Sequence, residues 1–383
     1  MKMYDEGTVF DVSEPEVTFD QEAHRIPEGG EKTGGIEWSI SAHLHGDDGK
    51  PYWIDCSVLS YPALDLLAGV IGPSDITMFN LRTESNRGEV VQSRKTIYKI
   101  AKFPNSDPLV FRYYPLGSLK VARSDDQVTI ELGVSKFTIN SDKSWHFTMD
   151  DAETGVKVAL VHRGEGFPMW YNDQPKDKAT NEVLRRFTPN SIGGGYFWPG
   201  PVEGTITVDG KTVKVHGAGG RQRYYALNYS QEEVGAWHDW NWFHFDEMQG
   251  CVEQIKASNY KVMSLYMRDD DAYFPNGGFD IEHHDWALHP LLGALIPTRY
   301  KVSIDTDAGE LVLTGNVVGS RVWASTEPPD CPFTMLDWEN VEGTFTYKDG
   351  RKQTLTNGVA GNLVRQWRPY PSPYLPDAAE LEM

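Results

Sequence analysis

The sequence has few cysteines and no long hydrophobic run. Its 383 residues include only Cys56, Cys251 and Cys331, and no Cys-x-x-Cys pair is present. This excludes a zinc ribbon and a thioredoxin-like redox motif, and three separated cysteines are typical of reduced thiols in the cytoplasm. No apolar segment reaches the about 18 residues that a membrane-spanning helix needs, and the N-terminus has no apolar signal core. We therefore expect a cytoplasmic protein without a membrane span.

Basic residues are scarce relative to acidic ones. Lys and Arg total 36 against 55 Asp and Glu, which gives a formal net charge of −19. Nucleic acid and anionic membrane surfaces both attract clustered Lys and Arg, so we expect neither as a partner. Aromatic residues are abundant at 12%, and they suit both a β-sheet core and the wall of an apolar pocket.

Motifs that bind cofactors are also missing. No P-loop, nucleophile elbow or dinucleotide-binding glycine motif is present. His43 and His45, on one face of a predicted strand, and the pair His283 and His284 could supply metal ligands, but a catalytic site needs three that converge. We expect activity that needs no metal, nucleotide or flavin.

Short segments of alternating polar and apolar residues dominate the chain. Residues 36–45 alternate as a strand does, and a Gly-Asp-Asp-Gly turn leads into a return strand over 51–60. Similar runs follow, bounded by Gly, Asp, Asn or Pro, at 109–114, 127–132, 144–150, 157–162, 204–208 and 212–216. This spacing is typical of all-β sandwiches or barrels. Helices are predicted only at 61–70 and 179–186.

A weak internal repeat divides the chain. Val202–Val208 returns as Val341–Tyr347, at an offset of 139, and each copy is followed by an Asp-Gly turn and a glycine-rich stretch. Two unrelated hairpins are the alternative, because short motifs also match by chance. The repeat predicts an irregular N-terminal arm over 1–34, β domains over 35–230 and 231–368, and a tail over 369–383.

These motifs resemble those of the carotenoid 1,2-hydratase (hydroxyneurosporene synthase) family, which is AttH-like and lipocalin-like. The similar segments are the aromatic Trp237–Gly250, the hairpin Gly204–Gly210 with Val215–Gly217, and, more loosely, Trp338, Glu342–Gly343 and Gly358–Asn362. The resemblance implies an all-β fold of two tandem lipocalin-like β-barrel or β-sandwich domains, with a pocket at their junction.

One block departs from that family. Its hydratase-like members carry an Asp-His pair after the first hairpin, whereas this chain has Gly219–Tyr225 without such a pair. If that pair is the acid of the hydratases, this chain lacks that acid. The fungal Diels–Alderases of decalin polyketide pathways are similar in architecture and free of cofactors, so the resemblance also implies a cyclase.

The aromatic strand over 237–245 contains the first candidate site. Because alternate side chains on a strand share a face, one face carries Trp237, Asp239, Asn241, Phe243 and Phe245, and the other carries His238, Trp240, Trp242 and His244. A carboxyl among apolar rings favours its neutral form and can donate a proton, and histidine can shuttle one. We predict Asp239 and His244 as catalytic residues; a plain barrel wall is the alternative. The predicted substrate-binding residues are Trp237, His238, Trp240, Asn241, Trp242 and Phe243.

The second candidate site is the block without the Asp-His pair. We also predict Arg221, Arg223 and Tyr224 as catalytic residues, because they offer donors that could hold a carbonyl or enolate oxygen. A salt-bridged sheet edge is the other interpretation of the same residues.

Three functions fit these observations, each with a hydrophobic small molecule as partner. The first is a cofactor-independent cyclase or isomerase for a polyene, terpenoid or polyketide of secondary metabolism. The others are a hydratase or dehydratase of an isoprenoid alkene and a non-catalytic carrier of an apolar ligand. A carboxyl deep in the pocket favours hydration, Arg or Tyr donors without one favour cyclisation, and an all-apolar wall favours transport. Nothing in the sequence specifies the substrate or the oligomeric state.

Overall fold

Strands make up nearly all of the computed structural model. It describes residues 1–5, 8–12, 17–23, 35–61, 74–84, 89–92, 99–102, 105–106, 108–171, 192–228, 238–255, 260–289, 294–324 and 333–365. Within these ranges there is one short helix, α1 (Phe19–Ala23). The all-β fold predicted from the strand spacing is therefore confirmed. Of the two predicted helices, the first begins at Tyr61, which ends a strand, and all their other residues lie outside the described residues.

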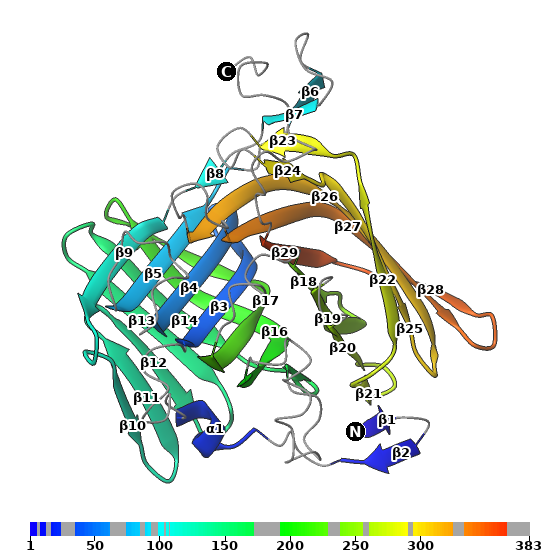
Figure 1. Cartoon of the computed structure of the whole chain (residues 1–383), viewed down its shortest axis with the longest axis horizontal. Coiled ribbons are helices and arrows are strands. Elements are labelled where there is room, and N and C mark those ends of the chain that lie inside the picture. The colour runs from blue at the N-terminus through cyan, green and yellow to red at the C-terminus, as the bar shows by residue number, and fades with distance from the viewer. Residues whose placement is uncertain are drawn as a thin grey trace.

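The first sheet has 12 strands and curves into a half-barrel (Figure 1). Its order is β10-β11-β12-β13-β14-β16-β17-β3-β4-β5-β9, with β15 paired to β16. The strands are β3 (Gly35–Gly46), β4 (Pro51–Tyr61), β5 (Ser74–Arg82), β9 (Pro108–Pro115), β10 (Lys120–Arg123), β11 (Gln127–Leu132), β12 (Ser135–Asn140), β13 (Trp145–Asp151), β14 (Val156–His162), β15 (Met169–Trp170), β16 (Ile192–Val208) and β17 (Lys211–Asn228).

The second sheet has 13 strands and faces the first. Its order is β2-β1-β21-β20-β19-β18-β29-β27-β26-β25-β22, with β28 on β27 and β8 on β26. The strands are β1 (Lys2–Asp5), β2 (Thr8–Asp11), β8 (Asn105–Ser106), β18 (His238–His244), β19 (Met248–Ile255), β20 (Tyr260–Met267), β21 (Ala272–Phe274), β22 (Gly278–His284), β25 (Arg299–Asp305), β26 (Gly309–Ala324), β27 (Phe333–Tyr347), β28 (Lys352–Thr354) and β29 (Val359–Arg365).

A small third sheet, in the order β24-β23-β7-β6, joins segments that are far apart in the sequence. It consists of β6 (Glu89–Gln92), β7 (Lys99–Lys102), β23 (Ala287–His289) and β24 (Ala294–Ile296).

The two large sheets share a pairing pattern. β3 pairs with β17 and β17 with β16, and in the same way β18 pairs with β29 and β29 with β27. β16 and β27 contain the two copies of the Val-Glu-Gly-Thr segment, and Ile206 and Phe345, at matching positions, are buried in the two cores. After β16, Asp209 and Gly210 have φ angles of 52° and 74°, which a tight hairpin turn requires. The predicted domain boundary at 230/231 lies outside the described residues.

Each half-barrel has its own apolar core. In the first, alternate residues of β11 and β12, such as Val128, Ile130 and Phe137, point inward and are buried. In the second, Leu311, Leu313 and many others do the same. Alternation with a period of two places these side chains on one face of each strand, so both interiors are packed with side chains.

The N-terminal arm is more regular than the sequence predicted. Its β1 pairs in parallel with β21 of the second sheet, and the N-terminal amine lies 2.9 Å from the Asp271 carboxylate. The helix α1 instead lies at the edge of the first sheet (Figure 1), where Val17 joins the core. The arm therefore touches both sheets.

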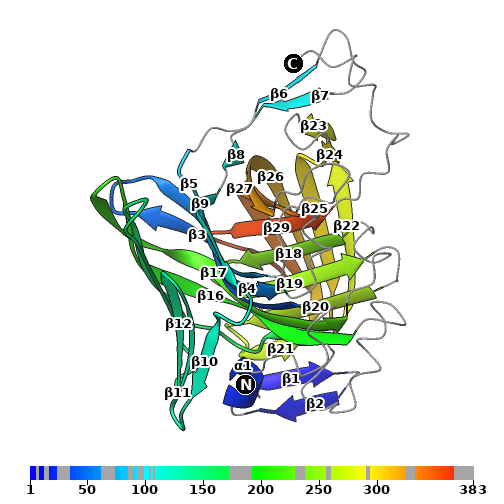
Figure 2. The ribbon, with the colours of Figure 1, turned by 60° about the vertical axis from the view of Figure 1, so that its left-hand side comes forward.

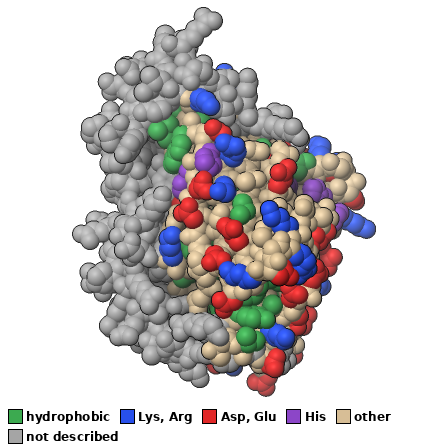
Figure 3. Space-filling model, turned by 90° about the vertical axis from the view of Figure 1, so that its right-hand side faces the viewer, with side chains coloured by type: hydrophobic (Ala, Val, Ile, Leu, Met, Phe, Trp, Pro, Cys, Tyr) green, Lys and Arg blue, Asp and Glu red, His purple; other side chains and the backbone are tan. Residues whose placement is uncertain are grey.

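The exposed surface carries both signs of charge. Over the face shown in Figure 3, Lys and Arg side chains are interspersed with Asp and Glu. Among the described residues, no helix combines the length and the apolar character that crossing a bilayer requires.

Candidate functional site

The two large sheets pack against each other through β16, β17, β3 and β5 on one side and β18, β19, β26 and β29 on the other (Figure 2). As a result, β3 is buried on both faces except at His45, and β5 is buried along its whole length. One face of β3 points into the first core, and the other carries polar residues toward the second sheet. The sequence predicted that polar and apolar residues alternate along β3. In the structure, the second sheet covers the polar face.

A group of polar residues fills one side of this contact; we call it the inter-sheet polar layer. It contains His43, Trp53, Asp55, Arg82, Arg321 and Asp337, with Glu37 farther along β3. Arg82 Nε donates to Asp337 Oδ2 at 2.9 Å, and Arg321 Nε donates to Asp337 Oδ1 at 3.0 Å. Arg321 Nη2 forms an ion pair with the same Oδ1 at 2.8 Å. Two buried guanidinium groups therefore share one carboxylate.

An indole ring and an imidazole ring pack beside these arginines. The Arg82 guanidinium lies 3.6 Å from the centre of the Trp53 ring, and the His43 ring stacks on Trp53 at 4.6 Å. Burial lowers the pKa of His43 to about 3, so this imidazole is neutral at pH 7. A cation on an indole face is stabilised by the ring quadrupole.

Polar atoms of the layer are left without partners. Within the described part of the chain, Arg82 Nη2, Arg321 Nη1, Asp55 Oδ2, His43 Nδ1 and Trp53 Nε1 are buried and make no hydrogen bond. A buried polar atom of this kind costs free energy, and several close together are an arrangement that a polar ligand group could satisfy.

Two carboxyl groups lie on the same face of β3 and β4. Burial raises the pKa of Glu37 to about 8, against the opposing effects of Ser39 and Arg223. Burial also raises the pKa of Asp55 to about 6, with Arg321 opposing it; Ser41 Oγ donates to Asp55 Oδ1 at 3.0 Å. At pH 7 Glu37 is therefore mainly a neutral acid, while Asp55 is mainly ionised.

An aromatic cluster lies next to the polar layer, between the same sheets. It joins Trp240 and Trp242 of β18 to Phe197, Tyr171 and Met335, with Tyr224 packed against it. Phe197 meets Trp240 edge-on at 4.4 Å. Three predicted site residues, Trp240, Trp242 and Tyr224, thus lie between the sheets.

The two predicted arginines point the other way, into the first core. Arg221 lies over the rings of Trp198 and Trp145, at 4.4 and 5.0 Å. Arg223 lies 4.1 Å from the Trp38 ring and donates to backbone carbonyls. The period-two alternation of β17 separates both from Tyr224.

Asp239 and Asn241 point into the second core. Asp239 accepts hydrogen bonds from His283 Nε2 at 3.0 Å and from Gln254 Nε2 at 3.1 Å. Phe243 belongs to the same core. The two faces of β18 are therefore those that the sequence predicted. One face packs in the second core, and the other packs between the two sheets.

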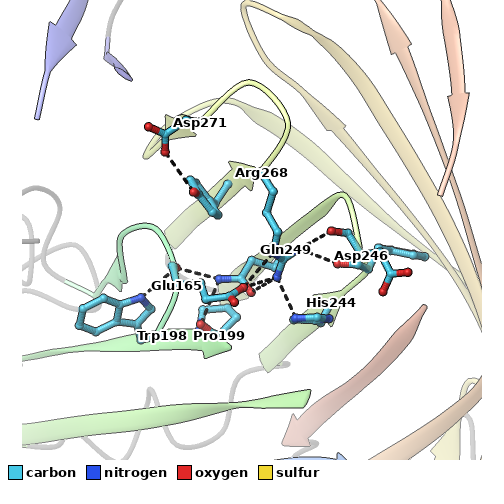
Figure 4. A network of polar contacts seen from close by, with 10 residues as sticks. Glu165, Trp198, Pro199, His244, Asp246, Gln249, Arg268 and Asp271 are labelled. Atoms are coloured by element: carbon cyan, nitrogen blue, oxygen red, sulfur yellow. Dashed lines mark hydrogen bonds and ion pairs between the residues drawn. The ribbon is translucent and has the colours of Figure 1, made fainter. Parts of the chain in front are cut away.

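His244 belongs to a cluster at another point of the sheet contact (Figure 4). Arg268 Nη2 donates to His244 Nε2 and to Gln249 Oε1, both at 2.8 Å, and pairs with Glu165. Burial, reinforced by the Arg268 charge, lowers the pKa of His244 to about 3. His244 is therefore neutral, and its Nε2 lone pair is already used.

The structure says little about the other predicted site residues, and it separates the four histidines considered as metal ligands. Trp237 lies outside the described residues, and only the backbone of His238 is described, within β18. His43 and His45 are on β3, whereas His283 and His284 are on β22 of the other sheet. In the described ranges no three His, Cys, Asp or Glu side chains gather as metal ligands would.

The sequence interpretation missed Glu37, Asp55, Arg82, Arg321 and Asp337. A signal for Asp55 was present, because it lies between Ile54 and Cys56 in the middle of a predicted strand, where an unpaired charge is rare. Arg82 had no such signal, since its partner Asp337 comes from the other half of the chain.

Comparison with known proteins gives matches only at the level of structure. No family model and no curated protein matches this chain. CghA in complex with Sch210972 is 11% identical over 88% of this chain and 89% of its own, with a TM-score of 0.54. CghA in a second structure is also 11% identical, over 90% and 94%, with a TM-score of 0.54.

An AttH from Nitrosomonas europaea is 10% identical over 96% of this chain and 99% of its own, with a TM-score of 0.48. At these identities, what the chain shares with CghA is the fold.

Proposed function

We propose that this chain is an enzyme, a cofactor-independent cyclase or isomerase that acts on a hydrophobic polyene, terpenoid or polyketide intermediate bearing a carbonyl group. The proposed site is the inter-sheet polar layer with the neighbouring aromatic cluster. The observation that carries the proposal is the pair of buried guanidinium nitrogens, Arg82 Nη2 and Arg321 Nη1, that make no hydrogen bond within the described residues. The buried carboxyl of Glu37, mainly protonated at pH 7, lies on the same sheet face as Arg82. CghA, which shares the fold, has been solved with the small molecule Sch210972.

Each group has a role in this chemistry. Arg82 Nη2 and Arg321 Nη1 have no other partner among the described residues and would donate to the carbonyl oxygen, which polarises the conjugated system. Arginine keeps its charge and acts here as a donor, not as an acid. Glu37 would lend a proton to the same system and recover it once the ring closes or the double bond moves, so the reaction needs no co-reactant.

The aromatic cluster would hold the apolar part of the substrate. Trp240, Trp242 and Tyr224 offer flat, rigid surfaces between the sheets. Such surfaces hold a flexible chain in a reactive shape, which lowers the entropic part of the barrier.

Hydration of an alkene is the second candidate, and Asp55 is the observation in its favour. Its Oδ2 makes no hydrogen bond within the described part of the chain, and the carboxyl is mainly ionised at pH 7. It could therefore activate a water molecule while Glu37 protonates the alkene. A non-catalytic carrier is less favoured, because its ligand would meet charged groups instead of an all-apolar wall.

The test begins with small molecules that co-purify with the protein from its native host, identified by mass spectrometry. The purified compounds are then incubated with the enzyme in H₂¹⁸O. Cyclisation or isomerisation gives a product of unchanged mass without ¹⁸O, whereas hydration adds one ¹⁸O.

The rates of two variants test whether the reaction takes place in the inter-sheet polar layer. E37Q should lose about 100-fold or more in rate, and E131Q, on an exposed position of β11, should keep the parent rate. Equal rates for E37Q and the parent would contradict the proposal.

A further inference from the structure

A second buried ion pair lies inside the first sheet, apart from the inter-sheet polar layer. Glu22 of α1 is 0% exposed. Its Oε1 accepts hydrogen bonds from the Tyr196 hydroxyl and from Trp145 Nε1, the latter at 3.2 Å. Its backbone oxygen accepts from Trp38 Nε1 at 3.0 Å and from Arg223 Nε at 3.3 Å. The arm thus places a carboxylate inside the half-barrel.

The charged partner of Glu22 is held at a distance. Arg221 is also 0% exposed, and its Nη2 lies 3.9 Å from Glu22 Oε1, beyond hydrogen-bond length. Arg221 Nη1 donates to the backbone oxygen of Lys143. Within the described residues, Arg221 Nε and Nη2 and Glu22 Oε2 make no hydrogen bond. The buried pair is therefore incompletely satisfied, which weakens it.

The segment around Glu22 combines one buried carboxylate with apolar side chains, as a fatty acid does. Besides the carboxylate, Val17 joins the first core, and Phe19 and Ala23 pack against it. Arg221, the Tyr196 hydroxyl and Trp145 Nε1 together form a set of donors suited to a carboxylate. A carboxylate that is not tethered to a helix could approach Arg221 with both oxygens and satisfy the open donors.

We propose that the interior of the first sheet is a binding site for a carboxylate with an apolar tail, and that the segment over residues 17–23, which contains α1, is its built-in occupant. Glu22 takes the place of the ligand carboxylate, and Val17, Phe19 and Ala23 take the place of its tail. Such a ligand binds when α1 withdraws, so ligand and arm compete for Arg221. The site is independent of the reaction proposed between the sheets.

The test uses a fluorescent fatty acid, 11-(dansylamino)undecanoic acid, titrated into the full-length protein. E22A should bind it about tenfold more tightly than the parent, since the competing carboxylate is gone. D20N, an exposed change on the same helix, is the matched control and should bind as the parent does. The corresponding dansylamino alcohol, which lacks the carboxylate, should not gain affinity in E22A.

Two further variants assign the site. R221M in the E22A background should abolish the gain, and E37Q should leave binding unchanged, which separates this site from the proposed reaction. If E22A does not fold alone, E22Q, which keeps the volume of the side chain, replaces it with the same expected result. Equal affinity in the parent and the folded variant, or an equal gain for the alcohol, would overturn the proposal.

Discussion

Two charged clusters join the same pair of sheets, and they differ in how fully their groups are satisfied. In one, Arg268 uses every nitrogen, since it donates to Glu165, Gln249, His244 and the backbone oxygens of Phe245 and Asp246. In the other, the inter-sheet polar layer, each arginine keeps an unpartnered nitrogen within the described part of the chain. A satisfied cluster fastens two surfaces, whereas an unsatisfied one can take a ligand.

The loop that contains Glu165 also packs closely on both sheets. Glu165 lies between Gly164 and Gly166, where an added Cβ would meet the rings of Trp198 and Tyr266 at 2.3 and 2.4 Å. The Gly164 approach therefore packs the loop on β16 of its own sheet, and the Gly166 approach packs it on β20 of the second sheet. We interpret the Arg268 cluster as a structural fastening and the polar layer as the candidate site.

The largest effect is expected at the centre of the polar layer. D337N removes the carboxylate that two buried guanidinium groups share and should lower the free energy of unfolding by about 3–5 kcal/mol. Urea unfolding followed by circular dichroism measures this, with D305N, 67% exposed and paired to Lys348, as the control. A D337N protein as stable as the parent would mean that the arginines are paired elsewhere.

Breaking the fastening should cost less. R268M removes several hydrogen bonds to a partly exposed guanidinium, and we expect a loss of about 2–3 kcal/mol in the free energy of unfolding. R299M, where the arginine is 52% exposed, should change it little. The rate of the proposed reaction, measured at a temperature where R268M is folded, should stay within a few-fold of the parent; a complete loss would place this cluster in the site.

The protonation of Glu37 should appear as a pH dependence of stability. Because its pKa is raised from 4.5 to about 8 in the folded protein, the folded state holds a proton that the unfolded state releases between these values. Stability from this group is complete below pH 4.5 and is lost as pH rises toward 8, with a slope of at most about 1.4 kcal/mol per pH unit. Urea titrations of the parent and E37Q at pH 5–8 should differ by this slope, and parallel curves would contradict the assignment.

The smallest effect is expected at His244. Because its pKa is lowered to about 3, it does not titrate near neutral pH. H244Q should therefore leave the pH dependence of the reaction unchanged between pH 5 and 8 and cost about 1 kcal/mol of stability for the altered hydrogen bond. A loss of the rate together with a shift of the pH profile would restore His244 to the catalytic role predicted from the sequence.

Much of the local structure follows from the sequence alone. Alternation with a period of two predicted most strands, and it assigned Asp239 and Trp240 to opposite faces of β18. The Asp-Gly pairs predicted tight turns, because Asp209 and Gly210 can adopt positive φ angles. These features depend only on neighbouring residues, so a single sequence is enough to predict them.

The tertiary structure decided what each face meets. Alternation shows that Arg221 and Tyr224 diverge, but not that Glu22 of the arm lies beside Arg221 or that a second sheet covers the polar face of β3. Arg82 and Asp337 come from opposite halves of the chain, and no local pattern links them. A strand's period fixes which side chains share a face, whereas the environment that shifts the pKa of Glu37 and Asp55 is set by the element packed against that face.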